Sequence, residues 1–282
     1  MDKTFFLGLG GQKCGSSWIQ AYLAGQSGSD FGRLGEYQVW EHRLGGVFAR
    51  YRVPEPGAAQ KLRARIKRAV GAAEPVPHLR WRLQGDDTAY FDYFDGLLTA
   101  PGILRSGDIT PSYAALGPDL LTRIKRGMEA RGATVKVLFS MRDPVDRLRS
   151  HLRMEMAKGR LPAAKDNEAP LRQFYASDEA AARSRYDRTL QAIEQVFAPE
   201  DTHICLFEEL FTPDGITALA RFADVPVDAK AGAHLVNARE KGSGIPDSLA
   251  AEIANHYAPV YTAVAARLPQ IATLWPSARH LT

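Results

Sequence analysis

The chain has 282 residues, 45% of them hydrophobic, which is enough to bury a full core as one large domain. Its formal net charge is only +4, from 36 basic and 32 acidic residues, and this weak excess argues against a nucleic-acid polymer as the partner. Two cysteines cannot form a disulfide framework, and the seven histidines show no metal-ligand spacing. Composition therefore argues against a disulfide-stabilised scaffold, and we expect no metal.

The sequence begins with a short apolar run and a glycine-rich loop. Phe5 to Leu9 predicts a buried strand, and Gly10 to Ser17 follows with three glycines, a lysine and two serines. Such a backbone can turn successive N–H groups toward an anion. Lys13 would add a positive charge, and Ser16 and Ser17 would begin the next helix, whose N-terminus favours phosphate. The pattern predicts a phosphate-binding loop.

The loop differs from two better-known nucleotide-binding motifs. A Walker P-loop requires G-x-x-x-x-G-K-[ST], but Gln12 precedes Lys13 and Cys14 follows it. A dinucleotide fingerprint requires a third glycine where Lys13 stands. An ordinary glycine- and serine-rich turn before a helix is the alternative to phosphate binding.

The segment from about residue 43 to 100 is the least regular part of the chain, punctuated by four prolines, and we expect it to pack around a substrate site. Within it, Gln60 to Val70 predicts an amphipathic helix with its apolar side chains on one face and five basic side chains elsewhere. A solvated helix is the simplest interpretation. Binding of an anionic substrate is the alternative.

Three further apolar strands are predicted, and helical patterns alternate with them. They span Ile103 to Ser106, Val135 to Met141 and His203 to Phe207. Alternation of this kind predicts an α/β fold, in which a parallel sheet has helices on both faces and ligand-binding loops at the carboxyl ends of its strands.

A second candidate anion site follows the strand that ends at residue 141. Asp143 and Pro144 predict a helix start, with Arg142 just before it and Ser150 in its second turn. Arg142 and Ser150 could converge on one anion. Alternatively, Arg142 pairs with Asp146 four residues on. Together with the first loop, this segment indicates a nucleotide that carries phosphate at both ends.

These two segments, KCGSSW at 13–18 and SMRDPVDRLRSH at 140–151, resemble the sulfotransferases that use 3′-phosphoadenosine 5′-phosphosulfate (PAPS). The first is similar to their K-[SGT]-G-T-T-[WL] loop for the 5′-phosphosulfate, and the second to their motif for the 3′-phosphate. The resemblance implies a P-loop-like sulfotransferase fold over 1–282 as one domain, with an acceptor-side insertion at about 43–100. It implies sulfuryl transfer to a hydroxyl or amine of an unidentified acceptor, such as a carbohydrate or another small hydroxylated molecule.

The resemblance also implies a base that takes the acceptor's proton. In the branch that includes heparan sulfate and many bacterial sulfotransferases, a K-E-x-H-x-F segment supplies a glutamate, and Glu36 in GEYQVWEH matches it. The lysine and histidine of that pattern are Gly35 and Gln38 here, and His42 and His151 are the alternative bases. The second catalytic residue would be the loop lysine, which stabilises charge on the bridging oxygen.

The donor-binding residues implied by the resemblance come from four segments. Tyr186 would stack on the adenine, with core packing as the alternative role. Lys241 would reach the 3′-phosphate from a polar cofactor-covering loop, NAREKGSG at 237–244. The same composition is also typical of an ordinary surface loop, which is the alternative. The full set is Lys13, Cys14, Gly15, Ser16, Ser17, Trp18, Arg142, Ser150, Tyr186, Lys241 and Gly242.

Two other functions stay open from the sequence. One is a P-loop-like kinase or nucleotide hydrolase, and the other is a noncatalytic nucleotide- or anionic-glycan-binding protein that has lost its base. No apolar run approaches the 18 residues of a membrane span, so we expect a cytoplasmic enzyme without a membrane partner. The sequence leaves the oligomeric state open.

Overall fold

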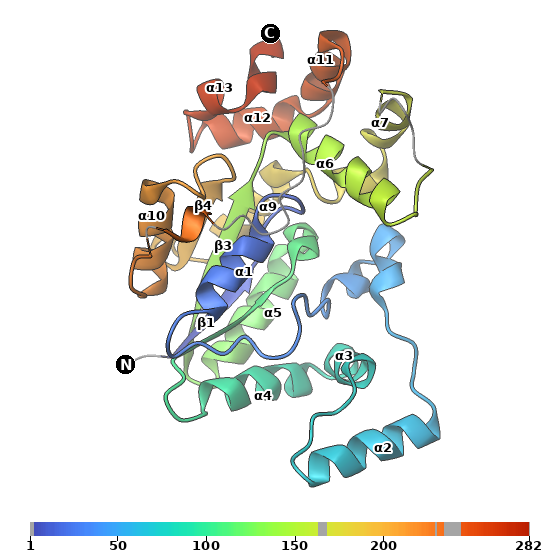
Figure 1. Ribbon diagram of the computed structural model, residues 1–282, viewed down its shortest axis with the longest axis vertical. Coiled ribbons are helices and arrows are strands. Elements are labelled where there is room, and N and C mark those ends of the chain that lie inside the picture. The colour runs from blue at the N-terminus through green and yellow to red at the C-terminus, as the bar shows by residue number, and fades with distance from the viewer. Residues whose placement is uncertain (1–2, 163–167, 229, 234–243, 282) are drawn as a thin grey trace.

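The computed structural model describes residues 3–162, 168–228, 230–233 and 244–281. Within them, four strands form one parallel sheet in the order β2-β1-β3-β4 (Figure 1). The predicted α/β fold with a parallel sheet is confirmed, and the strands lie within a few residues of the predicted ranges. The strands are β1 (Lys3–Gly8), β2 (Arg105–Ile109), β3 (Ala133–Met141) and β4 (Thr202–Leu206).

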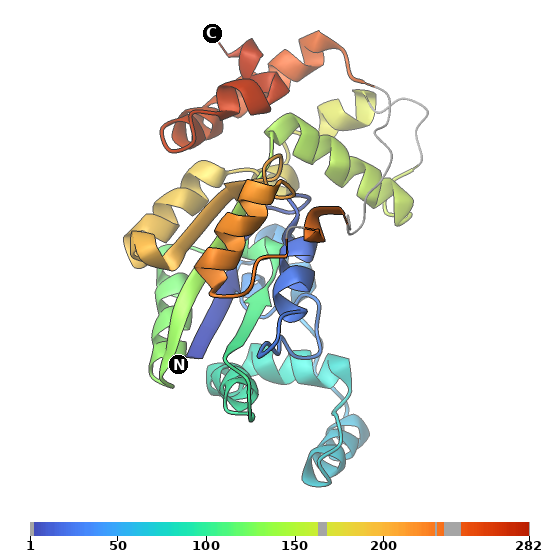
Figure 2. The ribbon, with the colours of Figure 1, turned by 60° about the vertical axis from the view of Figure 1, so that its left-hand side comes forward.

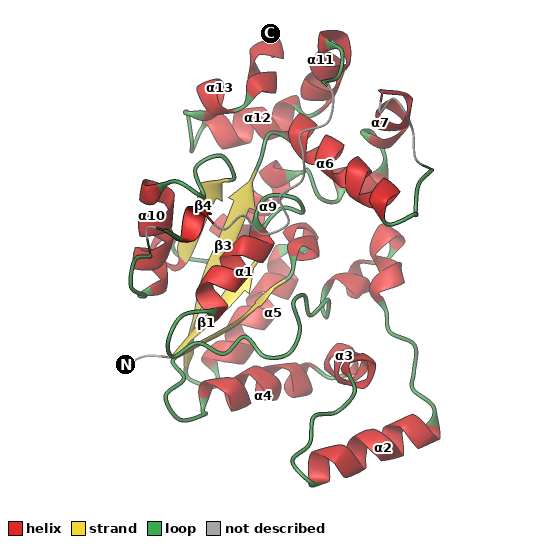
Figure 3. Ribbon diagram, viewed as in Figure 1, coloured by secondary structure: helices red, strands yellow, loops and turns green. Residues whose placement is uncertain are grey.

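Helices cover both faces of the sheet (Figure 3). Successive strand residues point to opposite faces, so Phe5 and Leu7 lie in one core while Phe6 lies in the other. The smaller core, with Phe6, is closed by α1 (Ser16–Ala24) and α10 (Pro213–Ala223), which lie side by side in Figure 2, in blue and orange. The larger core is closed by α4 (Asp87–Leu98), α5 (Pro118–Glu129) and α9 (Tyr186–Val196).

The segment from residue 43 to 100 contains helices rather than an extended loop. The predicted amphipathic helix is confirmed as α2 (Ala58–Ala69), with Ala64 as its buried residue. Figures 1 and 2 place α2 at the opposite end of the molecule from α6. The other elements near this segment are η1 (Glu41–Leu44), η2 (Gly46–Tyr51), α3 (Val76–Gly85) and the short η3 (Pro111–Ala115) that follows β2.

A group of helices lies beyond the carboxyl ends of the strands (Figure 1). Asp143 joins this group to the sheet, because its carboxylate accepts the Val145 N–H at 2.9 Å, the Tyr261 hydroxyl at 2.8 Å and the Ser277 N–H at 2.9 Å. The helices are α6 (Pro144–Ala157), α7 (Glu168–Phe174), α8 (Asp178–Ala181), α11 (Asp247–His256), α12 (Ala258–Ala265) and α13 (Ile271–Leu274). The remaining short turns are η4 (Pro199–Asp201), η5 (Ala231–Ala233) and η6 (Pro276–His280).

None of the helices in the described ranges combines the length and the apolar character that crossing a bilayer would require.

Candidate active site

The predicted phosphate-binding loop connects β1 to α1 and runs alongside β3. The Leu9 N–H donates to the Leu138 carbonyl at 2.8 Å, and the Gly11 N–H donates to the Ser140 carbonyl at 2.9 Å. Gly15 has φ +91°, and a Cβ built on it would lie 2.5 Å from a methyl carbon of Leu210, so glycine is required there. The backbone therefore turns sharply just before α1.

Lys13 lies in the middle of this turn with φ +72°, a left-handed conformation that is uncommon for a residue with a side chain. Helix α1 begins at Ser16, which is buried, and Ser17 beside it is exposed. The helix has no side-chain N-cap, so its first N–H groups depend on another partner. Trp18 anchors the start of α1, because its indole N–H donates to the Ala231 carbonyl at 3.3 Å.

The second predicted anion site adjoins the first. Arg142 follows β3, and its guanidinium carbon lies 4.5 Å from the centre of the Phe207 ring. A Cβ built on Gly15 would lie 3.4 Å from the same ring, so Phe207 lies beside both the predicted phosphate-binding loop and Arg142. The alternative pairing with Asp146 is present but loose, with 3.7 Å between Arg142 Nη2 and Oδ2. Ser150 is half-buried on α6.

Cys14 of the loop and Tyr186 at the start of α9 lie side by side. Both are fully buried, with 3.5 Å between the Cys14 sulfur and the Tyr186 hydroxyl oxygen. Burial raises the pKa of the Cys14 thiol to about 11, so it is neutral near pH 7. The Tyr186 ring packs edge-on against Phe139 and near Trp275. Adenine stacking by Tyr186 stays a prediction, and it would require the ring to move.

Arg147 is a functional candidate that the sequence reasoning missed. It is fully buried on α6, and none of its three guanidinium nitrogens has a hydrogen-bond partner in the part of the chain that the structure describes. Burial lowers the pKa of Arg147, and Cys14 and Tyr186 are among the groups that interact with it electrostatically. A guanidinium stays charged in proteins, so a positive charge with no ion-pair partner among the described residues lies near Cys14 of the predicted loop.

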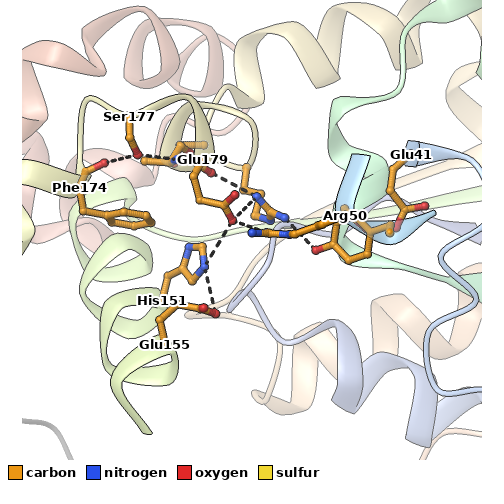
Figure 4. Close-up of polar contacts among 12 residues, drawn as sticks. Glu41, Arg50, His151, Glu155, Phe174, Ser177 and Glu179 are labelled. Atoms are coloured by element: carbon orange, nitrogen blue, oxygen red, sulfur yellow. Dashed lines mark hydrogen bonds and ion pairs between the residues drawn. The ribbon is translucent and has the colours of Figure 1, made fainter. Parts of the chain in front are cut away.

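A second buried arginine in this region is compensated. Figure 4 shows Glu179 facing Arg50, with 2.6 Å between Glu179 Oε1 and Arg50 Nη2. The same carboxylate oxygen lies 2.7 Å from Arg183 Nη1. His151 Nε2 lies 3.7 Å from Glu155 Oε1 and 3.9 Å from Glu179 Oε1, beyond hydrogen-bond reach. Burial, followed by the nearby arginine charges, lowers the pKa of His151 to about 2. This neutral imidazole is a weak base, which disfavours His151 as the proton acceptor.

The segment that carries Glu36 is fixed by hydrogen bonds to the end of β2. The Tyr37 N–H donates to Thr110 Oγ1 at 3.0 Å, and the Val39 N–H donates to the Tyr113 hydroxyl oxygen at 3.0 Å. Both hydroxyls in turn donate to the buried Asp108 carboxylate, at 2.6 Å and 2.8 Å. Asp108 therefore positions this backbone through two intermediate side chains.

Glu36 itself is exposed on this fixed backbone. Arg80 donates from Nη2 to the Glu36 carbonyl at 2.8 Å and from Nε to the Tyr37 carbonyl at 2.8 Å. The Glu36 side chain accepts one hydrogen bond from Gln38 Nε2 at 3.1 Å. A carboxylate so placed can accept a proton from a group that approaches from solvent.

Glu41 is another buried carboxyl near this segment. It accepts a hydrogen bond from Ser112 Oγ at 2.6 Å through Oε1, while Oε2 has no partner among the described residues. Burial raises the pKa of Glu41 to about 7. The alternative base His42 is half-buried, with Nδ1 2.7 Å from the Val39 carbonyl oxygen, and burial lowers its pKa.

Two predicted donor-binding residues and the question of a metal site complete the description of the site. Lys241 and Gly242 lie outside the described residues. The described residues contain no cluster of three or more His, Cys, Asp or Glu side chains that could hold a metal ion.

A signal for Arg147 was present in the sequence. It stands five residues after Arg142 on a helix that begins at Pro144, and residues 147 and 151 share a helix face that differs from that of Asp146. An arginine that shares a helix face with His151 and the apolar Pro144 and Leu148 is a candidate for a buried charge.

Comparison with known proteins identifies similar folds but no similar sequences. No protein-family model matches the chain, and no curated protein matches it in sequence. A sulfotransferase from Alicyclobacillus acidocaldarius superposes with a TM-score of 0.59 at 18% identity, over 94% of this chain and 96% of that one. The sulfotransferase domain of the Synechococcus PCC 7002 olefin synthase has a TM-score of 0.49 at 16% identity, over 82% and 77% of the two chains. The α/β architecture described above is thus a sulfotransferase fold.

Proposed function

We propose that the chain is a PAPS-dependent sulfotransferase, of the bacterial and heparan-sulfate-like branch, that acts on a hydroxyl or amine of an acceptor such as a carbohydrate. One observation carries the proposal: two turns suited to anions follow the neighbouring parallel strands β1 and β3, and the Phe207 ring lies beside Gly15 of the first and Arg142 of the second. A nucleotide with phosphate at both ends would use both turns at once.

The electrostatics of the site support a polyanionic ligand. Among the described residues, buried Arg147 near Cys14 has no ion-pair partner, and buried Arg142 Nε has no hydrogen-bond partner. Burying cations costs free energy that only a nearby anion or a hydrogen-bonding group recovers. Phosphate oxygens would supply both the negative charge and the hydrogen-bond acceptors.

In the proposed reaction, the acceptor oxygen or nitrogen forms a bond to sulfur as the bond from sulfur to the bridging oxygen of the phosphosulfate breaks. Glu36 takes the acceptor proton, and Lys13 stabilises the negative charge on the departing bridging oxygen. Ser16, Ser17 and the N-terminus of α1 hold the phosphosulfate, while Arg142 and Ser150 hold the 3′-phosphate.

The chain would form a single domain, with the segment from about 43 to 100 on the acceptor side. An open groove of about 930 Å³ has Leu44 to Phe48 along one wall and residues of η3, α8 and α9 along the others. Phe48 also lies against the Arg183 guanidinium, at 5.3 Å, which connects the groove wall to the Glu179 network. We further propose that the enzyme acts in the cytoplasm.

Calorimetry with 3′-phosphoadenosine 5′-phosphate (PAP), the desulfated product, tests the proposal without knowledge of the acceptor. We expect micromolar binding in the absence of magnesium and its loss in Arg142→Ala. Arg131→Ala is the matched control, because Arg131 precedes β3 at the opposite edge of the sheet and pairs with Asp92.

Two other outcomes would point elsewhere. Absence of PAP binding together with magnesium-dependent binding of ATP would replace the proposal by a P-loop-like kinase or nucleotide hydrolase. PAP binding without turnover on any acceptor, and unchanged behaviour of Glu36→Gln, would favour a noncatalytic nucleotide- or glycan-binding protein.

A further inference from the structure

Helix α2 directs its apolar side chains toward solvent. Leu62, Ile66 and Val70 are 58%, 56% and 73% exposed, whereas Ala64 is fully buried. At ~100° per residue, the first three lie along one side of the helix and Ala64 lies almost opposite them. The apolar stripe, defined by residues 62, 66 and 70, therefore points away from the body of the protein. The ordinary solvated helix expected from the sequence would expose its polar face instead.

The helix is attached to the body through its opposite side. The Lys61 ammonium lies 5.1 Å from the centre of the Trp81 ring on α3, and Lys61 also pairs with Glu55. Figures 1 and 2 both show α2 at an end of the molecule, remote from α6. Nothing in the described residues covers the apolar stripe, so it is available to an external surface.

The charges on α2 complement an anionic surface. Its sequence from Ala58 to Ala69, AAQKLRARIKRA, contains five basic residues and no acidic one. By helical geometry Arg63 and Arg65 flank the apolar stripe on its two opposite edges, and Lys67 lies beyond Arg63. An apolar stripe bordered by cations on both sides is typical of helices that lie in the plane of a membrane interface.

We propose that α2 docks this protein on an anionic lipid surface, with the apolar stripe at the headgroup boundary and Arg63, Arg65 and Lys67 against lipid phosphates. A single helix that projects from the body can lie on a flat bilayer, where headgroups meet both basic edges. A protein partner would instead need an apolar groove with acidic groups on both rims. Docking in this way leaves the carboxyl edge of the sheet facing the aqueous phase, and it is independent of the proposed sulfuryl transfer.

Vesicle flotation tests the proposal with the full-length protein. We expect it to float with vesicles that contain phosphatidylglycerol, to stay in solution with pure phosphatidylcholine, and to be released by salt. Arg63→Gln with Arg65→Gln should weaken binding about thirty-fold, the loss expected for two basic residues at an anionic surface. Leu62→Gln with Ile66→Gln should also reduce it at least tenfold.

Val227→Gln is the matched control, because Val227 is also an exposed apolar side chain, at 48%, but lies outside α2. It should float like the unmodified protein. All substituted side chains are exposed, and circular dichroism should show that the variants fold alike. Failure to float with anionic vesicles, or flotation that the α2 variants leave unchanged, would overturn the proposal. Light scattering that shows a dimer dissociated by the Leu62 and Ile66 changes, without lipid binding, would assign the stripe to a second copy of the chain instead.

Discussion

Replacing Arg147 by methionine should make the ligand-free protein more stable and its nucleotide binding weaker. The guanidinium is fully buried with three unpartnered nitrogens among the described residues, so its removal ends an uncompensated desolvation penalty. Methionine fills much of the same space with an unbranched apolar chain. Exchange of a buried ion pair for apolar side chains of similar volume is often neutral or stabilises proteins by about 1–4 kcal/mol. Because Arg147 has no ion-pair partner to lose among the described residues, we expect Arg147→Met to raise the free energy of unfolding within this range.

The binding effect of the same change has the opposite sign. One unit charge at a separation on the order of 8 Å, with an effective dielectric constant of about 20, contributes roughly 2 kcal/mol to the attraction of an anionic group. Its loss should raise the Kd for PAP about thirty-fold. Urea unfolding of the ligand-free protein measures the first quantity, and calorimetry with PAP measures the second.

Arg183→Met provides the matched control. Arg183 is equally buried, but it pairs with Glu179 and donates to the Tyr51 hydroxyl at 2.8 Å. Its removal leaves the Glu179 carboxylate and the Tyr51 hydroxyl without this hydrogen-bond donor, and it should lower the free energy of unfolding. If Arg147→Met also lowered the stability and left PAP affinity unchanged, the charge would serve the fold rather than a ligand, and the electrostatic reasoning would be refuted.

Three further predictions concern the base, the buried carboxyls and the loop. Glu36→Gln should lower turnover about 10²–10⁴-fold while PAP affinity is retained, and equal turnover would remove Glu36 as the base. Burial raises the pKa of Asp108 to about 6 and of Glu41 to about 7, so the folded state binds protons more tightly than the unfolded chain. The contribution of these two carboxyls to the free energy of unfolding therefore falls as pH rises from about 4 through 7, whereas the buried neutral His151 contributes with the opposite sign. In urea titrations over this range, the stability of Glu41→Gln relative to the unmodified protein should therefore rise with pH. Gly15→Ala, at φ +91° in a crowded turn, should weaken PAP binding and stability, whereas Gly35→Ala, with open space around it, should change neither in the same assays.

The sheet and the sharp turn before α1 could be predicted because their signals are local. Phe5 to Leu9 is a short apolar run that ends at glycines, and a run of this length with such a boundary is typical of a strand buried on both faces. The turn at Gly15 follows from the lack of a side chain. The apolar run and the glycine turn can therefore be recognised from neighbouring residues alone, without knowledge of contacts elsewhere in the chain.

Other features depend on contacts between distant parts of the chain. Amphipathic spacing predicted the helix α2, but the spacing cannot say whether Leu62 faces the body or the solvent. The role of Asp108 arises only when Thr110 and Tyr113 meet the segment after Glu36. The catalytic and donor-binding roles taken from the family resemblance stay predictions.

The strand order of the sheet has a consequence for how the chain folds during synthesis. Of the four described strands, β1 is made first, yet it lies inside the sheet, and its partners begin only at Arg105 and Ala133. At roughly 5–20 residues per second, a ribosome needs about 5–20 s to make the next hundred residues. During that time Phe5 and Phe6 have no strand to pair with. This topology therefore predicts slow folding, because β1 must pair with strands that are distant in the sequence. It also predicts that the nascent segment that contains β1 needs protection until those strands are made.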